Sequence, residues 1–281
     1  MEELNGRTAV VTGATAGIGR ETARLLAAAG VRLVLTGRRA DRLAEAAQGT
    51  DARTVAGDIC DPAVRRALVE ACDGRCDILV NNAGYGEPGP VELVTEEDAR
   101  RQLEVNLFSP ALMIREVLPL MRARRFGRIV NVSSVAGRLG YPLFGWYCAS
   151  KHALEGLSDA LRLEVAPWGV RVSLVEPGPV RTEFFDVSKG KALPRLEEET
   201  PYRPFFRHVD KIESDFMRQA TTPQHVARVI VAACRARRPR ARYAVTLMAK
   251  GALLAMRLLP RSLLDAVLRR QFKVPGPADV G

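Results

Sequence analysis

Short continuous runs of apolar residues alternate with longer segments of helical periodicity along most of the chain. The apolar runs predict buried strands at 8–12, 31–36, 53–56, 77–80, 128–133, 170–175 and 242–246. The segments between them predict helices at 18–29, 41–48, 96–122, 147–164 and 223–235, and one more that begins at 61–62, where Asp is followed by Pro. Strands of this kind, separated by helices, are typical of a parallel sheet with helices on both faces. We therefore expect an α/β fold that binds its ligand at the carboxyl ends of the strands.

Residues 183–221 depart from this alternation. They combine charges, three prolines and six aromatic residues without clear periodicity. A connection of this length is either a functional lid or partly disordered.

The C-terminal segment departs from it in another way. An apolar stretch precedes Pro260, and after this proline apolar residues recur at helical spacing, opposite basic ones. The apolar part before Pro260 carries Lys250 and Arg257, so it is too short and too charged to span a bilayer. A basic amphipathic helix can lie on an anionic membrane, on its own globule or on another subunit, and docking on protein is the interpretation that we favour.

Composition narrows the class of protein. The 281 residues, 47% hydrophobic and 26% charged, can form an ordinary globular core. Five scattered cysteines favour free thiols in a reducing compartment, and they make no metal-binding pattern. The acidic N-terminus lacks the apolar run of a signal peptide. We expect a cytoplasmic protein without a metal site.

The net charge of +10 leaves several partners open. An excess of this size could serve nucleic acid, an anionic membrane or a phosphorylated ligand, or it could be an arginine-rich solvated surface. No nucleic-acid motif and no interleaving of aromatic and basic residues occur, so we expect no nucleic-acid partner.

A glycine-rich turn follows the first strand and opens the first helix. Its sequence is Thr12-Gly13-Ala14-Thr15-Ala16-Gly17-Ile18-Gly19. Glycines allow a tight turn and a close approach of the backbone to a pyrophosphate, which the amino end of a helix attracts. The context of strand, turn and helix favours nucleotide binding over a turn without a ligand.

A second motif places a phenol beside an amine. Tyr147 and Lys151 are four residues apart, which puts both side chains on one face of a helix. We expect the Lys151 ammonium to favour the phenolate and lower the pKa of Tyr147, because an opposite charge stabilises the ionised form. Such a phenol can exchange a proton with a carbonyl or alcohol oxygen.

These motifs together resemble the classical short-chain dehydrogenase/reductase family. The resemblance rests on the glycine-rich turn, Asn81-Asn82-Ala83-Gly84, Asn106, Ser134, the Tyr147-x-x-x-Lys151 pair and Pro177-Gly178, in order and spacing over about residues 6–182. It implies a Rossmann-type doubly wound parallel sheet of about seven strands, and hydride transfer between a nicotinamide and a carbonyl or alcohol. It also implies a homo-oligomer, either a dimer or a tetramer.

The resemblance assigns roles at the matching positions. Tyr147 would protonate the carbonyl oxygen, Lys151 would lower its pKa and bind the nicotinamide ribose, and Asn106 would anchor a water that leads to Lys151. Ser134 would hold the substrate oxygen, with the adjacent Ser133 as the competing candidate. The implied cofactor contacts are Gly13, Thr15, Ala16, Gly17, Ile18, Gly19, Arg38, Arg39, Asp58, Ile59, Asn82, Ala83, Gly84, Tyr147, Lys151, Pro177, Gly178, Val180 and Thr182. For Asp58, helix capping is the alternative to adenine binding.

The second strand also bears on the choice of cofactor. Thr36-Gly37-Arg38-Arg39 stands where an NAD enzyme of this fold has a carboxylate for the ribose 2′-hydroxyl. Arginine suits a 2′-phosphate, so we expect NADP(H) rather than NAD, with Arg38 as the main contact and Arg39 stacked on adenine. The alternative is two solvated arginines.

The sequence thus predicts an NADP(H)-dependent oxidoreductase with a catalytic domain at 1–247 and an amphipathic extension at 248–281. Apolar and aromatic residues before Tyr147 and in 183–221 suggest a bulky apolar substrate, such as a steroid, retinoid, fatty or polyketide-like carbonyl. The alternative is that these residues belong to the core or to a subunit contact. Membrane contact through the extension would suit such a substrate. The alternative hypothesis is an NADP(H)-binding sensor or scaffold without turnover.

Overall fold

Seven parallel strands form one sheet in the computed structural model, which describes residues 2–188, 190 and 199–277. The spatial order is β3-β2-β1-β4-β5-β6-β7, and all neighbouring pairs are parallel. The strands are β1 (Thr8–Thr12), β2 (Arg32–Gly37), β3 (Arg53–Ala56), β4 (Ile78–Asn81), β5 (Gly127–Val132), β6 (Val170–Glu176) and β7 (Arg242–Ala244). The predicted strands are confirmed to within two residues at their ends.

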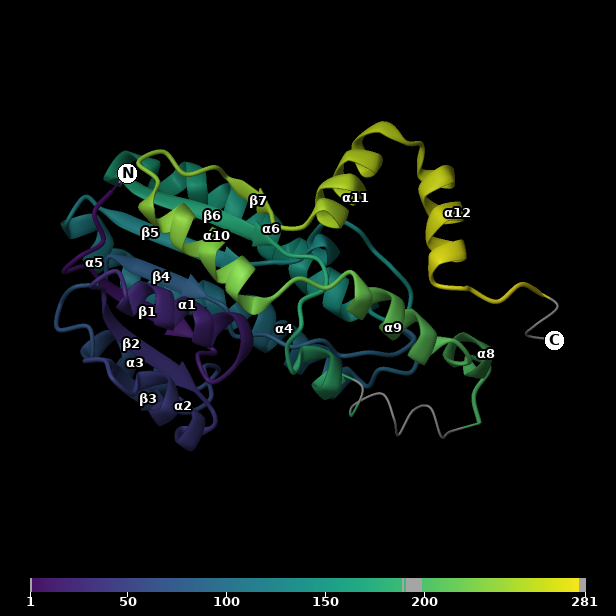
Figure 1. The fold of residues 1–281 in the computed structure, drawn as a ribbon, viewed down its shortest axis with the longest axis horizontal. Helices are drawn as coiled ribbons and strands as arrows, with labels where there is room; N and C mark the ends of the chain where they lie inside the picture. The colour runs from purple at the N-terminus through teal and green to yellow at the C-terminus, as the bar shows by residue number, and fades with distance from the viewer. Residues whose placement is uncertain (1, 189, 191–198, 278–281) are drawn as a thin grey trace.

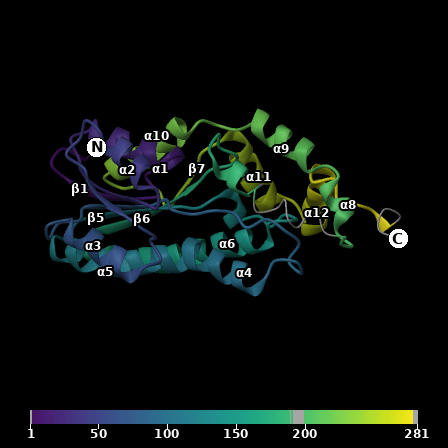
Figure 2. The ribbon, with the colours of Figure 1, turned by 90° about the horizontal axis from the view of Figure 1, so that it is seen from below.

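Helices cover both faces of this sheet (Figures 1 and 2). One face carries α1 (Gly17–Ala27), α2 (Ala40–Ala47) and α10 (Pro223–Arg235). The other carries α3 (Pro62–Glu70), α4 (Glu96–Leu103), α5 (Ser109–Ala123) and α6 (Gly145–Val165). Short 3₁₀ turns, η2 (Val135–Gly137) and η3 (Ala166–Trp168), precede and follow α6. The predicted doubly wound Rossmann-type fold is therefore confirmed.

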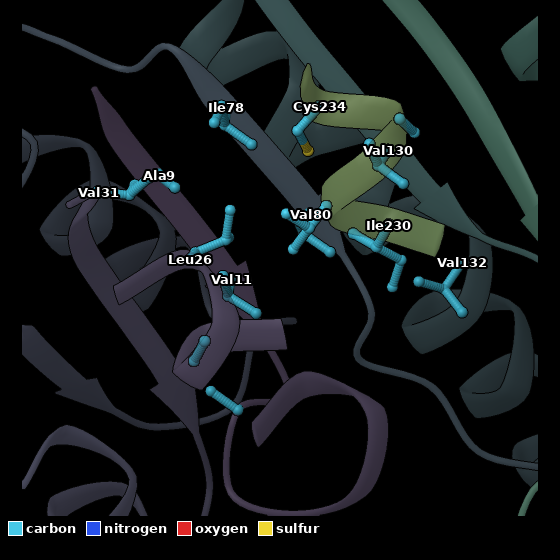
Figure 3. Close-up of a cluster of buried hydrophobic side chains, with 14 of the residues drawn as sticks. Ala9, Val11, Leu26, Val31, Ile78, Val80, Val130, Val132, Ile230 and Cys234 are labelled. Carbon is cyan, nitrogen blue, oxygen red and sulfur yellow. The ribbon is translucent and has the colours of Figure 1, made fainter. Parts of the chain in front are cut away.

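Alternate residues of the central strands build the two halves of the core. Val11 of β1 and Val80 of β4 pack with Leu26 of α1 and Ile230 of α10 (Figure 3). Their neighbours in the strands, such as Val10, belong to the opposite cluster with side chains from α3 and α5. Burial on both faces explains why these strands are apolar without interruption.

The order of strands reverses between β1 and β4. From β1 the chain proceeds to β2 and β3 on one side, and then it crosses to β4 and continues on the other. In open parallel sheets a crevice forms at such a point, outside the carboxyl ends of the strands. The glycine-rich turn after β1 and the Asn82-Ala83-Gly84 turn after β4 both border it.

One prediction is wrong in its detail, because the expected helix at 96–122 is not continuous. A π-helical turn, η1 (Glu104–Phe108), separates α4 from α5. Its centre is Asn106, whose side chain is hydrogen-bonded to a neighbouring loop and to α6. These contacts hold the Asn106 side chain where the wider turn directs it. Bulges of this kind are common at functional sites.

The two irregular segments contain helices. Within 183–221, where no periodicity was apparent, α8 (Arg203–Phe206) and α9 (Val209–Arg218) form, and residues 189 and 191–198 lie outside the described part. The C-terminal segment forms two helices, α11 (Leu247–Leu258) and α12 (Arg261–Gln271), rather than one. Proline at 260 explains the break, since it cannot continue α11. Among the described residues, no helix has the length and apolarity needed to cross a bilayer.

Candidate active site

The glycine-rich turn is packed too closely for any other residue type. Gly13 and Gly17 have φ angles of +67° and +53°, in the left-handed region that glycine adopts readily. A Cβ added at Gly13 would lie 2.9 Å from the Ala83 Cα, and one at Gly19 would lie 2.2 Å from the Gly13 carbonyl oxygen. The turn therefore presents bare backbone at the amino end of α1, which is the environment that a pyrophosphate needs.

Side-chain amides and hydroxyls fix the two turns against each other. The Asn82 Nδ2 donates to the carbonyl oxygens of Thr12 at 2.9 Å and Gly13 at 3.1 Å. In return, the Thr12 Oγ1 accepts from the backbone N–H groups of Asn82 and Ala83, both at 3.0 Å. The predicted cofactor segments at 12–19 and 82–84 are thus brought together as one rigid edge.

The segment after β6 closes the same edge. The Pro177 carbonyl accepts from the N–H of Val135, at the start of η2, at 3.1 Å. Farther along, the Thr182 methyl is so near the turn that a Cβ at Gly17 would lie 2.9 Å from it. Residues 177–182 therefore connect the end of β5 with the glycine-rich turn, where the predicted contacts Gly178, Val180 and Thr182 lie.

Tyr147 and Ser134 meet at the carboxyl end of β5. Tyr147 is on α6 with 7% of its surface exposed. Burial raises the pKa of Tyr147 to about 12, and the nearby Ser134 hydroxyl opposes this rise. The competing Ser133 is different, because its Oγ is buried without a hydrogen-bond partner among the described residues and faces Gly137. The structure therefore brings Ser134, rather than Ser133, to the phenol.

The expected influence of Lys151 on the phenol is wrong for this structure. Lys151 Nζ lies 5.9 Å from the Tyr147 ring centroid and donates to the Val132 carbonyl oxygen at 2.9 Å. Burial is the largest influence on the phenol, and only the Ser134 hydroxyl opposes it, so the Tyr147 pKa rises instead of falling. Burial also lowers the pKa of Lys151 to about 8, against an opposing effect of Glu155. Tyr147 is consequently a neutral phenol, which is the form that donates a proton.

Asn106 joins this group from the π-helical turn. Its Oδ1 accepts from the Tyr85 N–H at 3.1 Å, and its Nδ2 donates to the Tyr85 carbonyl at 2.9 Å and to Ser150 Oγ at 3.1 Å. A Cβ at Gly84 would lie 3.1 Å from the Asn106 Oδ1 and 3.6 Å from the Lys151 Nζ. Asn106 and Lys151 therefore both approach Gly84, while the water that the resemblance places between them stays a prediction.

The charged residues near the carboxyl end of β2 have distinct surroundings. Arg38 and Arg39 are both exposed. Arg39 Nη2 lies 2.8 Å from Glu183 Oε2 and 3.4 Å from Thr15 Oγ1, so Arg39 reaches across the glycine-rich turn. This ion pair is a competitor to the predicted stacking of Arg39 on adenine.

Asp58 is held beside this edge by its neighbours. Its Oδ1 accepts from the Cys60 N–H at 3.0 Å, and its Oδ2 pairs with Arg101. The cap of α3 is Asp61, whose carboxylate accepts from the Ala63 N–H at 2.8 Å. The alternative role of Asp58 as the cap of α3 is therefore wrong, and the adjacent Ile59 is buried.

Aromatic rings from separate segments surround the phenol. Phe144 and Phe184 contact Tyr147 with ring centroids 6.1 and 5.5 Å away. Tyr141 packs on Phe144 at 5.9 Å, and Phe272, which follows α12, stacks on Tyr141 at 5.1 Å. Aromatic rings thus surround Tyr147, and the apolar substrate pocket stays a prediction. The role of Phe272 was not foreseen, since only its helical spacing was visible in the sequence.

A buried ionic cluster under α6 was also missed. Arg242 Nε lies 2.9 Å from Glu155 Oε2 and 3.3 Å from Glu176 Oε1. Glu155 is four residues after Lys151 on the same helix, and this spacing was the available signal. Burial and the charge of Glu155 raise the pKa of Glu176 to about 7. The cluster connects the helix that carries Tyr147 to the last two strands.

Known proteins resemble this chain in sequence. The family described as short chain dehydrogenase matches residues 7–191. An NADPH-dependent 3-dehydrocapnine reductase of Ornithobacterium rhinotracheale is 34% identical over 95% of this chain and 98% of its own. A 3-ketodihydrosphingosine reductase of Bacteroides thetaiotaomicron is 40% identical over 63% of this chain and 65% of its own.

Solved structures agree with the sequence comparisons. A Burkholderia phymatum short-chain dehydrogenase/reductase in complex with NAD has a TM-score of 0.78 and 29% identity, and the match covers 95% of this chain and 96% of that one. A metagenomic short-chain oxidoreductase in complex with NADP has a TM-score of 0.69 and 31% identity over 87% and 98%. The chain therefore belongs to the short-chain dehydrogenase/reductase family of nucleotide-binding oxidoreductases.

Proposed function

We propose that the protein is an NADPH-dependent reductase of a ketone or aldehyde on a bulky apolar molecule, with Tyr147 as the general acid. The observation that carries the proposal is the neutral, buried Tyr147 phenol beside the Ser134 hydroxyl, within a ring of aromatic side chains. A phenol in this state can protonate the oxygen of a carbonyl while the carbon is reduced.

The residues at the sheet edge fit a dinucleotide. Bare backbone at Gly13, Gly17 and Gly19 suits the pyrophosphate, and the packing of the turn against neighbouring protein atoms leaves no room for a Cβ at these positions. When bound, NADPH supplies the hydride. Arg38 is exposed at the end of β2 and would hold the 2′-phosphate, because guanidinium binds phosphate through charge-assisted hydrogen bonds. The NADPH-dependent relative supports this choice over NAD.

The protein's own groups then have separate tasks. Ser134 would donate a hydrogen bond to the substrate oxygen and hold it at the phenol. Tyr147 would transfer its proton to that oxygen as negative charge develops there. Lys151, positioned by the Val132 carbonyl, would bind the ribose and stabilise the phenolate that remains. The pKa of Lys151, about 8, keeps the amine largely protonated at neutral pH.

The aromatic ring around Tyr147 supports an apolar substrate. Relatives named as reductases of 3-dehydrocapnine and 3-ketodihydrosphingosine, and one named as a 17-beta-hydroxysteroid dehydrogenase, point the same way. We include among the candidates a long-chain ketone, a steroid ketone and a retinoid aldehyde. We also propose a homo-oligomer, as the family resemblance implies.

Consumption of NADPH and of NADH, measured with 3-ketodihydrosphingosine, a steroid ketone, retinal and a small water-soluble ketone, tests the proposal. We expect faster turnover with NADPH, and with apolar carbonyls over the small ketone. Absence of turnover with every carbonyl, together with tight NADPH binding, would instead support the sensor or scaffold hypothesis.

A further inference from the structure

The C-terminal arm, defined here as residues 247–277, leaves apolar side chains in solvent. The outward positions of α11 recur at helical spacing and form one stripe, which consists of Leu247, Lys250, Gly251, Leu254, Arg257 and Leu258. Leu247 is 85% exposed, Leu254 57% and Leu258 68%. Leu263 and Val267 on α12 are also exposed, at 52% and 55%. An exposed set of large apolar side chains on adjacent helices marks an interaction surface.

The opposite side of the arm is attached to the globule. Ala249 and Leu264 are buried, and the Thr246 hydroxyl caps α11 by accepting from the Ala249 N–H at 3.0 Å. At the far end, Phe272 packs on Tyr141 and on Phe216 of α9, with centroids 5.1 and 5.7 Å away. The arm extends beyond the carboxyl end of the sheet in Figure 1. The exposed leucines are thus on the outside of a docked arm.

The charge of the arm indicates what its outer surface contacts. It contains six basic residues, Lys250, Arg257, Arg261, Arg269, Arg270 and Lys273, and one acid, Asp265. The net charge of the arm is therefore +5. Its 31 residues carry half of the net charge of +10 that belongs to all 281 residues. A second copy would place an equal positive charge against it, whereas an anionic lipid surface would complement it.

We infer that the outer stripe of the arm docks the protein on an anionic lipid bilayer. Leu247, Leu254 and Leu258 enter the interfacial layer, while Lys250 and Arg257, between them on the stripe, contact lipid phosphates. This docking goes beyond the proposed reductase activity and does not require it. The contact between Phe272 and Tyr141 places the inner end of the arm next to the aromatic surroundings of Tyr147.

Co-sedimentation of the full-length protein with vesicles tests the inference. One set of vesicles contains phosphatidylcholine with phosphatidylglycerol, and the other contains phosphatidylcholine alone. We expect at least tenfold stronger binding to the anionic vesicles, and a loss of binding as salt is raised, because salt screens the charges.

Two pairs of variants separate the apolar and the charged contribution. Leu254→Gln with Leu258→Gln should weaken binding at least tenfold, whereas Leu163→Gln on α6, where Leu163 is 74% exposed, should not. Lys250→Gln with Arg257→Gln should also weaken it at least tenfold. The charge-matched control is Arg237→Gln with Arg238→Gln. These two residues precede β7, whereas the arm follows it, so they lie at the opposite end of that strand.

Equal binding by arm variants and their controls, or no binding of the wild type to anionic vesicles, would overturn the inference. Light scattering would identify the alternative occupant. If wild type does not bind vesicles and the leucine variant forms a smaller oligomer, the arm covers a second copy of the chain. Far-ultraviolet circular dichroism of the same samples reports folding. Absence of turnover with all four carbonyls of the activity test, beside intact vesicle binding, would reject the reductase proposal alone.

Discussion

Arg39 and Glu183 form an ion pair across the mouth of the glycine-rich turn, with Nη2 and Oε2 2.8 Å apart. Both side chains are about half exposed, so the pair itself contributes little to stability. Its position matters more, because Glu183 places a negative charge beside the expected site of the 2′-phosphate.

Removing that charge should strengthen NADPH binding. Glu183→Gln frees Arg39 and eliminates repulsion, and we expect the Kd for NADPH to fall about two- to fivefold, the scale of an exposed ion pair. The Kd for NADH should stay unchanged, because NADH lacks the 2′-phosphate. Titration of cofactor fluorescence measures both, and an equal effect on the two cofactors would contradict this role of Glu183.

Arg38→Ala should have the opposite effect. Loss of one charge-assisted hydrogen bond at an exposed position should raise the Kd for NADPH about tenfold. The Kd for NADH should change little. Arg42→Ala, which removes an exposed arginine from α2, is the matched control. If Arg38→Ala leaves the preference for NADPH over NADH unchanged, Arg38 is a solvated surface residue, as the alternative interpretation has it.

Gly19→Ala should destabilise the protein by more than about 2 kcal/mol, because its Cβ would lie 2.2 Å from the Gly13 carbonyl oxygen. Gly156→Ala is the control, since no atom lies within 4 Å of a Cβ there and the residue is exposed on α6. We expect it to stabilise the fold by about 0.5–1 kcal/mol. Urea denaturation of both variants compares them, and equal stability would show that the turn is loosely packed.

Glu176→Gln should stabilise the protein at pH 8 and not at pH 4. Burial and Glu155 raise the pKa of Glu176 to about 7 in the folded state, from a usual 4.5. Between these values the folded protein retains a proton that the unfolded chain has lost, so wild-type stability falls as pH rises. Glutamine removes this dependence, and the advantage should reach about 1–3 kcal/mol above pH 7. Urea denaturation from pH 4 to pH 8 measures this dependence, with Glu164→Gln at an exposed position of α6 as the control. If both variants change stability alike, the pKa of Glu176 is not raised.

Local patterns in the sequence identified the sheet and most of the candidate site. Burial on both faces makes strands such as β4 continuously apolar, so their positions were visible. Tyr147 and Lys151 are on one helix, where spacing alone indicates a shared face.

The features that the sequence did not reveal depend on contacts between distant segments. The π-helical turn at Asn106 arises from partners in the Tyr85 loop and on α6, while the residues of η1 are themselves compatible with an α-helix. The raised pKa of Tyr147 results from burial by Phe184 and other rings, which a pair of residues on one helix does not show. The cluster of Arg242 with Glu155 and Glu176 likewise joins three separate elements.

Single-turnover transfer of deuterium from 4-deuterated NADPH to a ketone tests the central claim most directly. Wild type and Tyr141→Phe, which removes the hydroxyl of a neighbouring, partly buried tyrosine, should both yield product alcohol labelled at the carbinol carbon. Tyr147→Phe should bind NADPH within about threefold of wild type and transfer label about a hundred- to ten-thousandfold more slowly. Labelled alcohol formed at the wild-type rate by Tyr147→Phe would contradict the assignment of its phenol as the general acid.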